Sequence, residues 1–253
     1  MTSEAQPTPR EAHPSKGTLR VVQLYPREMN IYGDWGNALV LQQRIRWHGY
    51  TPELLEYNVG DDFPEDVDIL VGGGGQDSGQ LVIQDDLQAR AEQLKQLADG
   101  GAPMLVICGL YQLFGKFFKT STGPTIPGIG ILDVETHGTD ERLIGNVIMK
   151  SAEFGDILGY ENHSGQTTLG PGVEPLGTVT KGAGNNSKDG HEGARYNNVV
   201  ASYLHGSLLP KNPAIADFLI RTAAERKFGT FVPGTPDDDY ARLAREHAAR
   251  RPR

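Results

Sequence analysis

The chain has 253 residues, 38% of them hydrophobic, and a formal net charge of −8. This length suits one large α/β domain or two small ones. The acidic balance argues against nucleic-acid and anionic-membrane binding, because proteins of both kinds usually present a basic face. The single cysteine, Cys108, excludes an internal disulfide and fits a reducing compartment. No apolar run approaches the roughly 18 residues that a transmembrane helix needs.

The two ends of the chain differ in composition from the rest. Residues 1–18 are rich in proline and polar residues and have no apolar core of the kind that a secretory signal carries, so we expect a disordered tail. Residues 231–253 are highly charged. Within them, D-D-D-Y-A-R-L-A-R-E-H-A-A-R-R predicts an exposed helix whose acidic start and basic end suit the helix dipole. We therefore place one domain over residues 19–230.

The first half of this domain alternates strand and helix patterns. Short β-rich runs predict strands over 19–25, 51–59, 68–71 and 104–107. Helical spacing predicts helices over 38–49, capped by Asp34 or Asn37, and over 78–98. The run 104–107 is apolar throughout, which is typical of a strand buried on both faces of a parallel sheet. This order of elements is the signature of an α/β fold.

The pattern changes between residues 123 and 204. Four β-rich runs, 128–134, 142–150, 175–180 and 195–204, predict antiparallel strands and hairpins, with a loop over 182–194. A last helix is expected over 212–227, with Pro213 in its first turn.

Cys108 lies at a predicted strand-to-helix corner, in P-M-L-V-I-C-G-L-Y-Q-L-F-G. A buried cysteine often fills a core as a small apolar residue. At the carboxyl end of a parallel strand, however, a side chain faces the crevice where α/β proteins bind ligands, and a sharp turn into a helix exposes it. The helix N-terminus would stabilise a thiolate, and the N–H of Gly109 would point at an oxyanion. The position favours a nucleophile.

A cysteine nucleophile needs a base. His205 ends the β-rich run V-V-A-S-Y-L-H-G, so it can reach the same crevice and is the best partner for Cys108. His163, in G-Y-E-N-H-S-G, is the alternative. For either histidine, a surface or structural role stays open.

Three further features bear on the site. The run Gly72–Gly75 lacks the G-x-G-x-x-G and Walker A patterns; it allows close backbone approach and a second oxyanion donor, or forms a flexible turn before Ser78. Arg142 could hold the carboxylate of an amino-acid substrate, or pair with Asp140 or Glu141 at the surface. One cysteine and scattered histidines lack the spacing of metal ligands, so we expect no metal site.

Several motifs together resemble the class I glutamine amidotransferases. The elbow I-C-G-L-Y-Q and the segments G-Y-E-N-H-S-G and Y-L-H-G are similar to those of the cobyric-acid-synthase-like branch. Within that branch, Y-G-D-W-G-N at 32–37 and the free-standing length look like the glutaminase subunits of lipid II isoglutaminyl synthase. The resemblance covers about residues 19–230 and implies a three-layer α/β/α fold, with a mostly parallel central sheet and an added antiparallel β region.

The resemblance also implies a function. The chain would hydrolyse L-glutamine and supply ammonia, as one half of a heterodimer, to a Mur-ligase-like synthetase that amidates the D-glutamate of the lipid II stem peptide to D-isoglutamine. ATP and Mg would bind the partner, and this chain would hold no cofactor. A cytoplasmic location is implied, with peripheral contact at the inner face of the membrane through lipid II. By position, the implied site residues are Cys108 as nucleophile, His205 as base, Gly74, Gly75 and Gly109 at the oxyanion, and Gln112 and Arg142 as glutamine contacts.

The sequence departs from the family pattern at three positions. Val106 and Leu110 replace glycines that usually flank the cysteine, so we expect either a changed turn or a less preformed elbow. Ser207 stands where many class I enzymes place the acid that orients the histidine, so we expect the partner to supply that acid. Three alternatives stay open: an amidotransferase subunit for a cobyrinate-type acceptor, a stand-alone cysteine-dependent amide hydrolase, and a non-enzymatic subunit.

Overall fold

The main sheet of the protein runs through the middle of the molecule. The computed structural model describes residues 14–251, so most of the expected N-terminal tail lies outside the described residues. The sheet has six strands in the order β11-β12-β4-β3-β1-β2. Its strands are β1 (Thr18–Leu24), β2 (Thr51–Tyr57), β3 (Ile69–Gly72), β4 (Met104–Ile107), β11 (Ala194–Tyr196) and β12 (Val199–Ser202). All neighbours are parallel except β11, which is antiparallel to β12.

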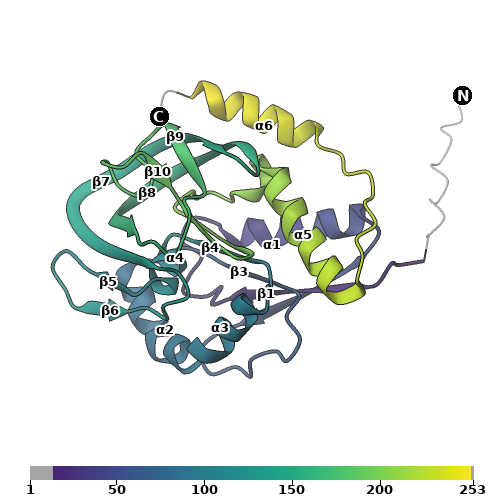
Figure 1. The fold of residues 1–253 in the computed structure, drawn as a ribbon, viewed down its shortest axis with the longest axis horizontal. Helices are drawn as coiled ribbons and strands as arrows, with labels where there is room; N and C mark the ends of the chain where they lie inside the picture. Colours follow the sequence, from purple (N-terminus) through teal and green to yellow (C-terminus); the bar gives the residue numbers. More distant parts are fainter. Residues whose placement is uncertain (1–13, 252–253) are drawn as a thin grey trace, which may run out of the picture.

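Helices cover both faces of this sheet. Figure 1 shows α1 and α5 on one side of the strands and α2 and α3 on the other. The helices are α1 (Trp35–Trp47), α2 (Asp77–Ala89), α3 (Ala91–Asp99), α4 (Gly109–Phe114) and α5 (Pro213–Phe228), with a 3₁₀ turn, η1, at Leu209–Lys211. Strands β3, β4 and β12 are buried along their whole length, as expected for strands covered on both faces. The predicted α/β class with a mostly parallel central sheet is confirmed.

The predicted continuous helix over 78–98 was wrong, because the chain forms two helices that meet at Arg90. The backbone of Arg90 has φ −95° and ψ −1°, and it ends α2 and begins α3. Its side chain donates a hydrogen bond to the hydroxyl of Tyr57 at 2.9 Å. The helix is therefore interrupted at a residue that contacts a distant strand, and the spacing of apolar residues did not reveal this interruption.

A second sheet of mainly antiparallel strands lies beside the first. Its order is β10-β9-β7-β5-β6, with β8 paired to β7. The strands are β5 (Phe117–Lys119), β6 (Thr125–Pro127), β7 (Val134–Ser151), β8 (Gly155–Leu169), β9 (Gly177–Lys181) and β10 (His191–Glu192). The long β7–β8 pair curves along one flank of the molecule (Figure 1).

Two strand predictions and one loop prediction in this half need correction. The run 128–134 is not a strand except at Val134, where β7 begins. The run 195–204 is not part of the antiparallel region, because β12 joins the main sheet parallel to β4. The expected loop at 182–194 contains β10 and the first residue of β11.

The segment after α5, residues 229–251, runs back over the domain, and we call it the C-terminal strap. It passes the end of α1, where Lys16 Nζ donates to the carbonyl of Val232 at 3.1 Å and the N–H of Gly234 donates to Nδ1 of His48 at 3.1 Å. It ends in α6 (Asp239–Arg250), which crosses the molecule toward β9 (Figure 1). Arg245 of α6 donates to the carbonyl oxygens of Lys211 and Asp156, at 2.7 Å each. No helix among residues 14–251 is long and apolar enough to cross a bilayer.

Candidate active site

Cys108 occupies a strained turn between β4 and α4. Its backbone has φ +48° and ψ −100°, a combination that a residue with a side chain rarely adopts. The N–H of Cys108 donates to the carbonyl of Ser202 at 2.8 Å, and its own carbonyl accepts from the N–H of Gln112 at 2.9 Å. The side chain is 6% exposed and lines a cavity. This is the nucleophile-elbow geometry in which the surrounding structure holds a reactive side chain out of the turn.

The elbow is formed although Val106 and Leu110 replace the usual glycines. Val106 pairs in register with Gly72 of β3, and a Cβ atom on Gly72 would collide with the side chain of Leu110. The bulk added in β4 and α4 is therefore offset by a missing side chain in the neighbouring strand. The expectation of a less preformed elbow does not fit this conformation.

His205 lies beside Cys108. A Cβ atom added to Gly74 would lie 2.7 Å from Cε1 of His205 and 3.0 Å from Cβ of Cys108, so the three residues converge. The N–H of His205 donates to the carbonyl of Tyr160 at 2.7 Å, and the ring of Tyr32 covers the imidazole with 4.4 Å between ring centres. The structure thus brings together the two residues expected to form the catalytic pair.

A carboxylate of this chain, that of Asp34, also lies in the site, although the sequence predicts for it only a capping role. Oδ2 of Asp34 is 3.6 Å from Nδ1 of His205, and both side chains are 2% exposed. Asp34 makes no side-chain capping bond to α1; its Oδ2 instead accepts the N–H of Gly74 at 2.8 Å. The only sign of this placement in the sequence was the motif Y-G-D-W-G-N.

The electrostatics of His205 favour its charged form. Burial alone would lower the pKa of this imidazole, but its interactions with Cys108 and with the carboxylate of Asp34 outweigh burial and raise the pKa to about 10. At neutral pH the imidazole is therefore protonated beside the sulfur. Such a group can donate a proton to a leaving amine.

The backbone of the glycine run Gly72–Gly75 passes close to Cys108. The N–H of Gly74 is occupied by Asp34, so Gly74 is not available as an oxyanion donor, contrary to our expectation. Gly75 lines the cavity, and a Cβ atom on Gly109 would lie 3.0 Å from the nitrogen of Gly75. Among the described residues neither Gly75 nor Gly109 donates its N–H to another group. These two amides are the donors left beside Cys108.

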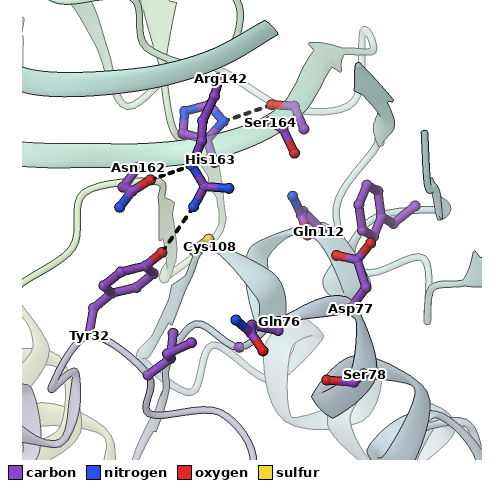
Figure 2. Close-up of a pocket in the computed structure, with 14 residues that line it drawn as sticks. Tyr32, Gln76, Asp77, Ser78, Cys108, Gln112, Arg142, Asn162, His163 and Ser164 are labelled. Atoms are coloured by element: carbon purple, nitrogen blue, oxygen red, sulfur yellow. Dashed lines mark hydrogen bonds between the residues drawn. The ribbon is translucent and has the colours of Figure 1, made fainter. Parts of the chain in front are cut away.

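A cavity of about 380 Å³ opens over the sulfur. In Figure 2, Cys108 lies between Arg142 and Tyr32 on one side and Gln112 and Asp77 on the other. The volume and the mixture of charged and amide groups suit a small polar ligand such as an amino acid.

Arg142 reaches this cavity through an irregularity in β7. The register of β7 against β8 shifts between Gly138 and Leu143, so the intervening residues bulge out of the strand. Nε of Arg142 donates to Asn162 at 2.8 Å, and a terminal nitrogen donates to the hydroxyl of Tyr32 at 3.2 Å (Figure 2). Arg142 is not paired with Asp140 or Glu141 in the part of the chain that the structure describes.

Gln112 and His163 also line the cavity. Gln112 is 5% exposed and donates to the hydroxyl of Tyr203 at 3.2 Å. His163 stacks on the ring of Tyr203, and its Nδ1 lies 2.7 Å from the carbonyl of Gly165. Burial lowers the pKa of His163 to about 4, so it is neutral at physiological pH. It lies in the wall of the cavity, while His205 lies next to the sulfur.

No group of three histidine, cysteine, aspartate or glutamate side chains within residues 14–251 is arranged to hold a metal ion.

Comparisons with known proteins agree with this geometry. Residues 20–213 match the family model of the CobB/CobQ-like glutamine amidotransferase domain. The chain is 38% identical over 222 residues to the GatD subunit of the glutamine-hydrolysing lipid II isoglutaminyl synthase of Staphylococcus aureus, covering 87% of this chain and 90% of that protein. It is 37% identical to the GatD subunit of Streptococcus pneumoniae, covering 91% and 90%. Among solved structures, a glutamine amidotransferase from Thermotoga maritima superposes with a TM-score of 0.53 at 15% identity, covering 92% of this chain and 90% of that one.

The elbow cysteine, the adjacent histidine and these matches lead to the same conclusion: the chain belongs to the CobB/CobQ-like family of glutamine amidotransferases.

Proposed function

We propose that this chain is the glutaminase subunit of a lipid II isoglutaminyl synthase. It hydrolyses L-glutamine at Cys108 and passes the ammonia to a Mur-ligase-like partner, which amidates the D-glutamate of the lipid II stem peptide. The observation that carries the glutaminase half is the strained elbow of Cys108 next to His205, in a cavity that Arg142 also lines.

The chemistry proceeds in two halves. The Cys108 thiolate attacks the side-chain amide carbon of glutamine, and the N–H groups of Gly75 and Gly109 stabilise the oxyanion. His205 gives its proton to the leaving nitrogen, the C–N bond breaks, and ammonia departs from a thioester. His205 then takes a proton from water, the hydroxide attacks the thioester, and the C–S bond breaks to release glutamate. Arg142 binds the α-carboxylate of glutamine, and Gln112 contacts the substrate beside it.

The choice of acceptor rests on the comparisons with the two groups of relatives. The chain and the two GatD subunits match over about nine-tenths of their lengths, with 90% of each relative covered. The cobyric acid synthases it matches are 27–32% identical, and the match spans 31–43% of their length. Identity to the GatD subunits is higher and extends over more of this chain than identity to the cobyric acid synthases, which favours the lipid II acceptor.

The partner completes the reaction. Ammonia needs an activated carboxyl group to form an amide, and we propose that the partner activates it with ATP and Mg. The two chains would form a heterodimer at the inner face of the membrane, where the partner binds lipid II.

A substitution at the nucleophile tests this proposal. The chain is co-expressed with a Mur-ligase-like partner, and amidation of lipid II is measured with glutamine or with ammonium chloride as nitrogen donor. Cys108→Ala should abolish amidation from glutamine, a loss of about 10⁴-fold or more, and leave amidation from ammonium unchanged. Undiminished amidation from glutamine by this variant would favour a non-enzymatic role.

Two other outcomes identify the alternatives. In the first, the complex hydrolyses glutamine and amidates a cobyrinate-type acceptor, but does not amidate lipid II from either nitrogen source. The acceptor would then be the cobyrinate-type compound and not lipid II. Hydrolysis of many amides, with no effect of the partner, would point to a stand-alone hydrolase.

A further inference from the structure

The side chain of Gln80 is buried between the nucleophile turn and the wall of the cavity. It extends from the first turn of α2 and is 1% exposed. Its amide nitrogen donates two hydrogen bonds, to the carbonyl of Gly109 at 3.0 Å and to Oε1 of Gln112 at 2.8 Å. Both acceptors lie in α4, directly after Cys108. One side chain from another helix therefore joins two residues to which the proposed reaction gives a role.

These bonds fix which way the amide of Gln112 points. The carbonyl of Gly109 can only accept, so the NH₂ group of Gln80 must face it. The same NH₂ group meets Gln112, so the atom of Gln112 on that side must be the oxygen. The NH₂ group of Gln112 is then directed at the hydroxyl of Tyr203 and the cavity, where it takes up the bond of 3.2 Å to Tyr203. It has a second hydrogen, so Gln112 presents a donor to whatever binds there.

The bond to Gly109 acts on the backbone of the elbow. Cys108 has an unfavourable conformation that costs of order 1–3 kcal/mol and persists only if its surroundings hold it. On one side Cys108 is held by the carbonyl of Ser202. On the other, the bond from Gln80 holds the carbonyl of Gly109, the residue whose N–H the proposed reaction assigns to the oxyanion.

We propose that Gln80 is a positioning residue of the glutaminase site. By holding the carbonyl of Gly109 and the oxygen of Gln112, it directs two N–H donors at the oxygens of bound glutamine. The inference rests on the proposed function, since it assumes that glutamine is the ligand. It adds that the wall of the cavity beside Gln112 recognises a substrate oxygen and not an N–H group.

A matched pair of variants on α2 tests this role. Gln88 lies on the same helix and donates to the carbonyls of Pro127 and Gly128 at 3.0 Å each, away from the cavity. Gln80→Met should raise the KM for glutamine several-fold and lower kcat/KM by about 10- to 100-fold, because both donors lose their alignment. Gln88→Met should leave both constants within about twofold of the wild-type values.

A cycle with Gln112 separates positioning from general support of the fold. In a Gln112→Met background, adding Gln80→Met should lower kcat further through Gly109 but raise KM no more, since the donor of Gln112 is already gone. A thermal melt of each variant monitors folding. If Gln80→Met does not fold, Gln80→Asn replaces it, because the shorter side chain cannot span both acceptors, and the same losses are expected.

Wild-type constants in a folded Gln80→Met or Gln80→Asn variant would overturn the inference, as would equal losses in the Gln80 and Gln88 variants. Failure of the proposed function looks different, because the wild-type chain, alone and in its complex, would then not hydrolyse glutamine.

Discussion

At the scale of single residues, the site differs from expectation mainly in its acid. The sequence has Ser207 where an acid is common, and this led us to expect a carboxylate from the partner. The structure places Asp34 of this chain 3.6 Å from Nδ1 of His205. That distance is too long for a hydrogen bond but short enough for charge to act across a buried site. Supply of an acid by the partner stays a prediction.

Asp34→Asn tests the charge of this acid. Asparagine can still accept the N–H of Gly74, so the loop should keep its shape. Losing the charge removes one of the groups that raise the pKa of His205, so the imidazole deprotonates at lower pH. The alkaline limb of the kcat/KM profile should move to lower pH, and kcat at neutral pH should fall by about 10- to 100-fold. Profiles recorded with and without the partner check this. A variant that keeps the wild-type profile in the complex would show that another group orients His205.

At the scale of elements, the sequence predicted the parts of the fold with strong apolar patterns. Strands β1 and β4 and helix α5 appear where periodicity placed them. Strand β8 was not predicted, because the side chains it buries include polar ones such as Glu161, His163 and Thr167. Alternation of apolar and polar residues cannot reveal a strand whose inner face is partly polar. For the same reason, the placement of Arg142 by a bulge in β7 depends on pairing that no local pattern encodes.

The buried carboxyl group of Glu192 links the end of β10 to the strand that leads to His205. It accepts from the N–H of Tyr203 at 2.7 Å and from the hydroxyl of Ser202 at 3.2 Å. Burial raises the pKa of Glu192 to about 8. The folded state therefore keeps this proton where the unfolded state releases it, at a pKa near 4.5, and the contribution of Glu192 to stability falls as the pH rises from about 4.5 to about 8.

Glu192→Gln should remove this dependence, because the amide keeps the acceptor for Tyr203 and does not ionise. One unit of pKa difference is worth about 1.4 kcal/mol, so the variant should gain several kcal/mol over the wild type between about pH 5 and about pH 8. Denaturant unfolding at a series of pH values measures this difference. A constant difference across the series would mean that Glu192 does not titrate in this range.

At the scale of the whole molecule, the C-terminal strap connects regions that are far apart in the sequence. Arg44 of α1 is bidentate to Asp217 of α5 at 2.7 Å and also pairs with Asp238 at the start of α6. Arg245 binds the carbonyl of Lys211, which lies six positions after His205. The boundary that we placed at residue 230 therefore separates segments that contact each other extensively.

Arg245→Ala should destabilise the fold, whereas Arg242→Ala should not. Among the described residues, Arg242 pairs only with Asp239 and Glu246 of its own helix, and such surface pairs contribute little. Arg245 gives charged hydrogen bonds to two backbone carbonyls of other elements, each worth about 1.5–3 kcal/mol where shielded from water. Since Arg245 is partly exposed, we expect a melting temperature lower by about 3–8 °C. Calorimetry of both variants measures this difference in melting temperature. Equal melting temperatures would mean that the contacts of Arg245 in α6 do not stabilise the domain.

The turn after His205 has a consequence for how this chain can change over evolutionary time. The hydroxyl of Ser207 donates to the carbonyl of Gly33 at 2.8 Å, and a Cβ atom on Gly36 would collide with that same side chain. A larger acid at position 207 would meet the first turn of α1, and a side chain at position 36 would displace Ser207. Added bulk at either position would therefore have to be accommodated at the other position or by a shift of the loop that carries Asp34. The two positions are therefore coupled, and we expect an acid after the histidine only together with a compensating change in this loop.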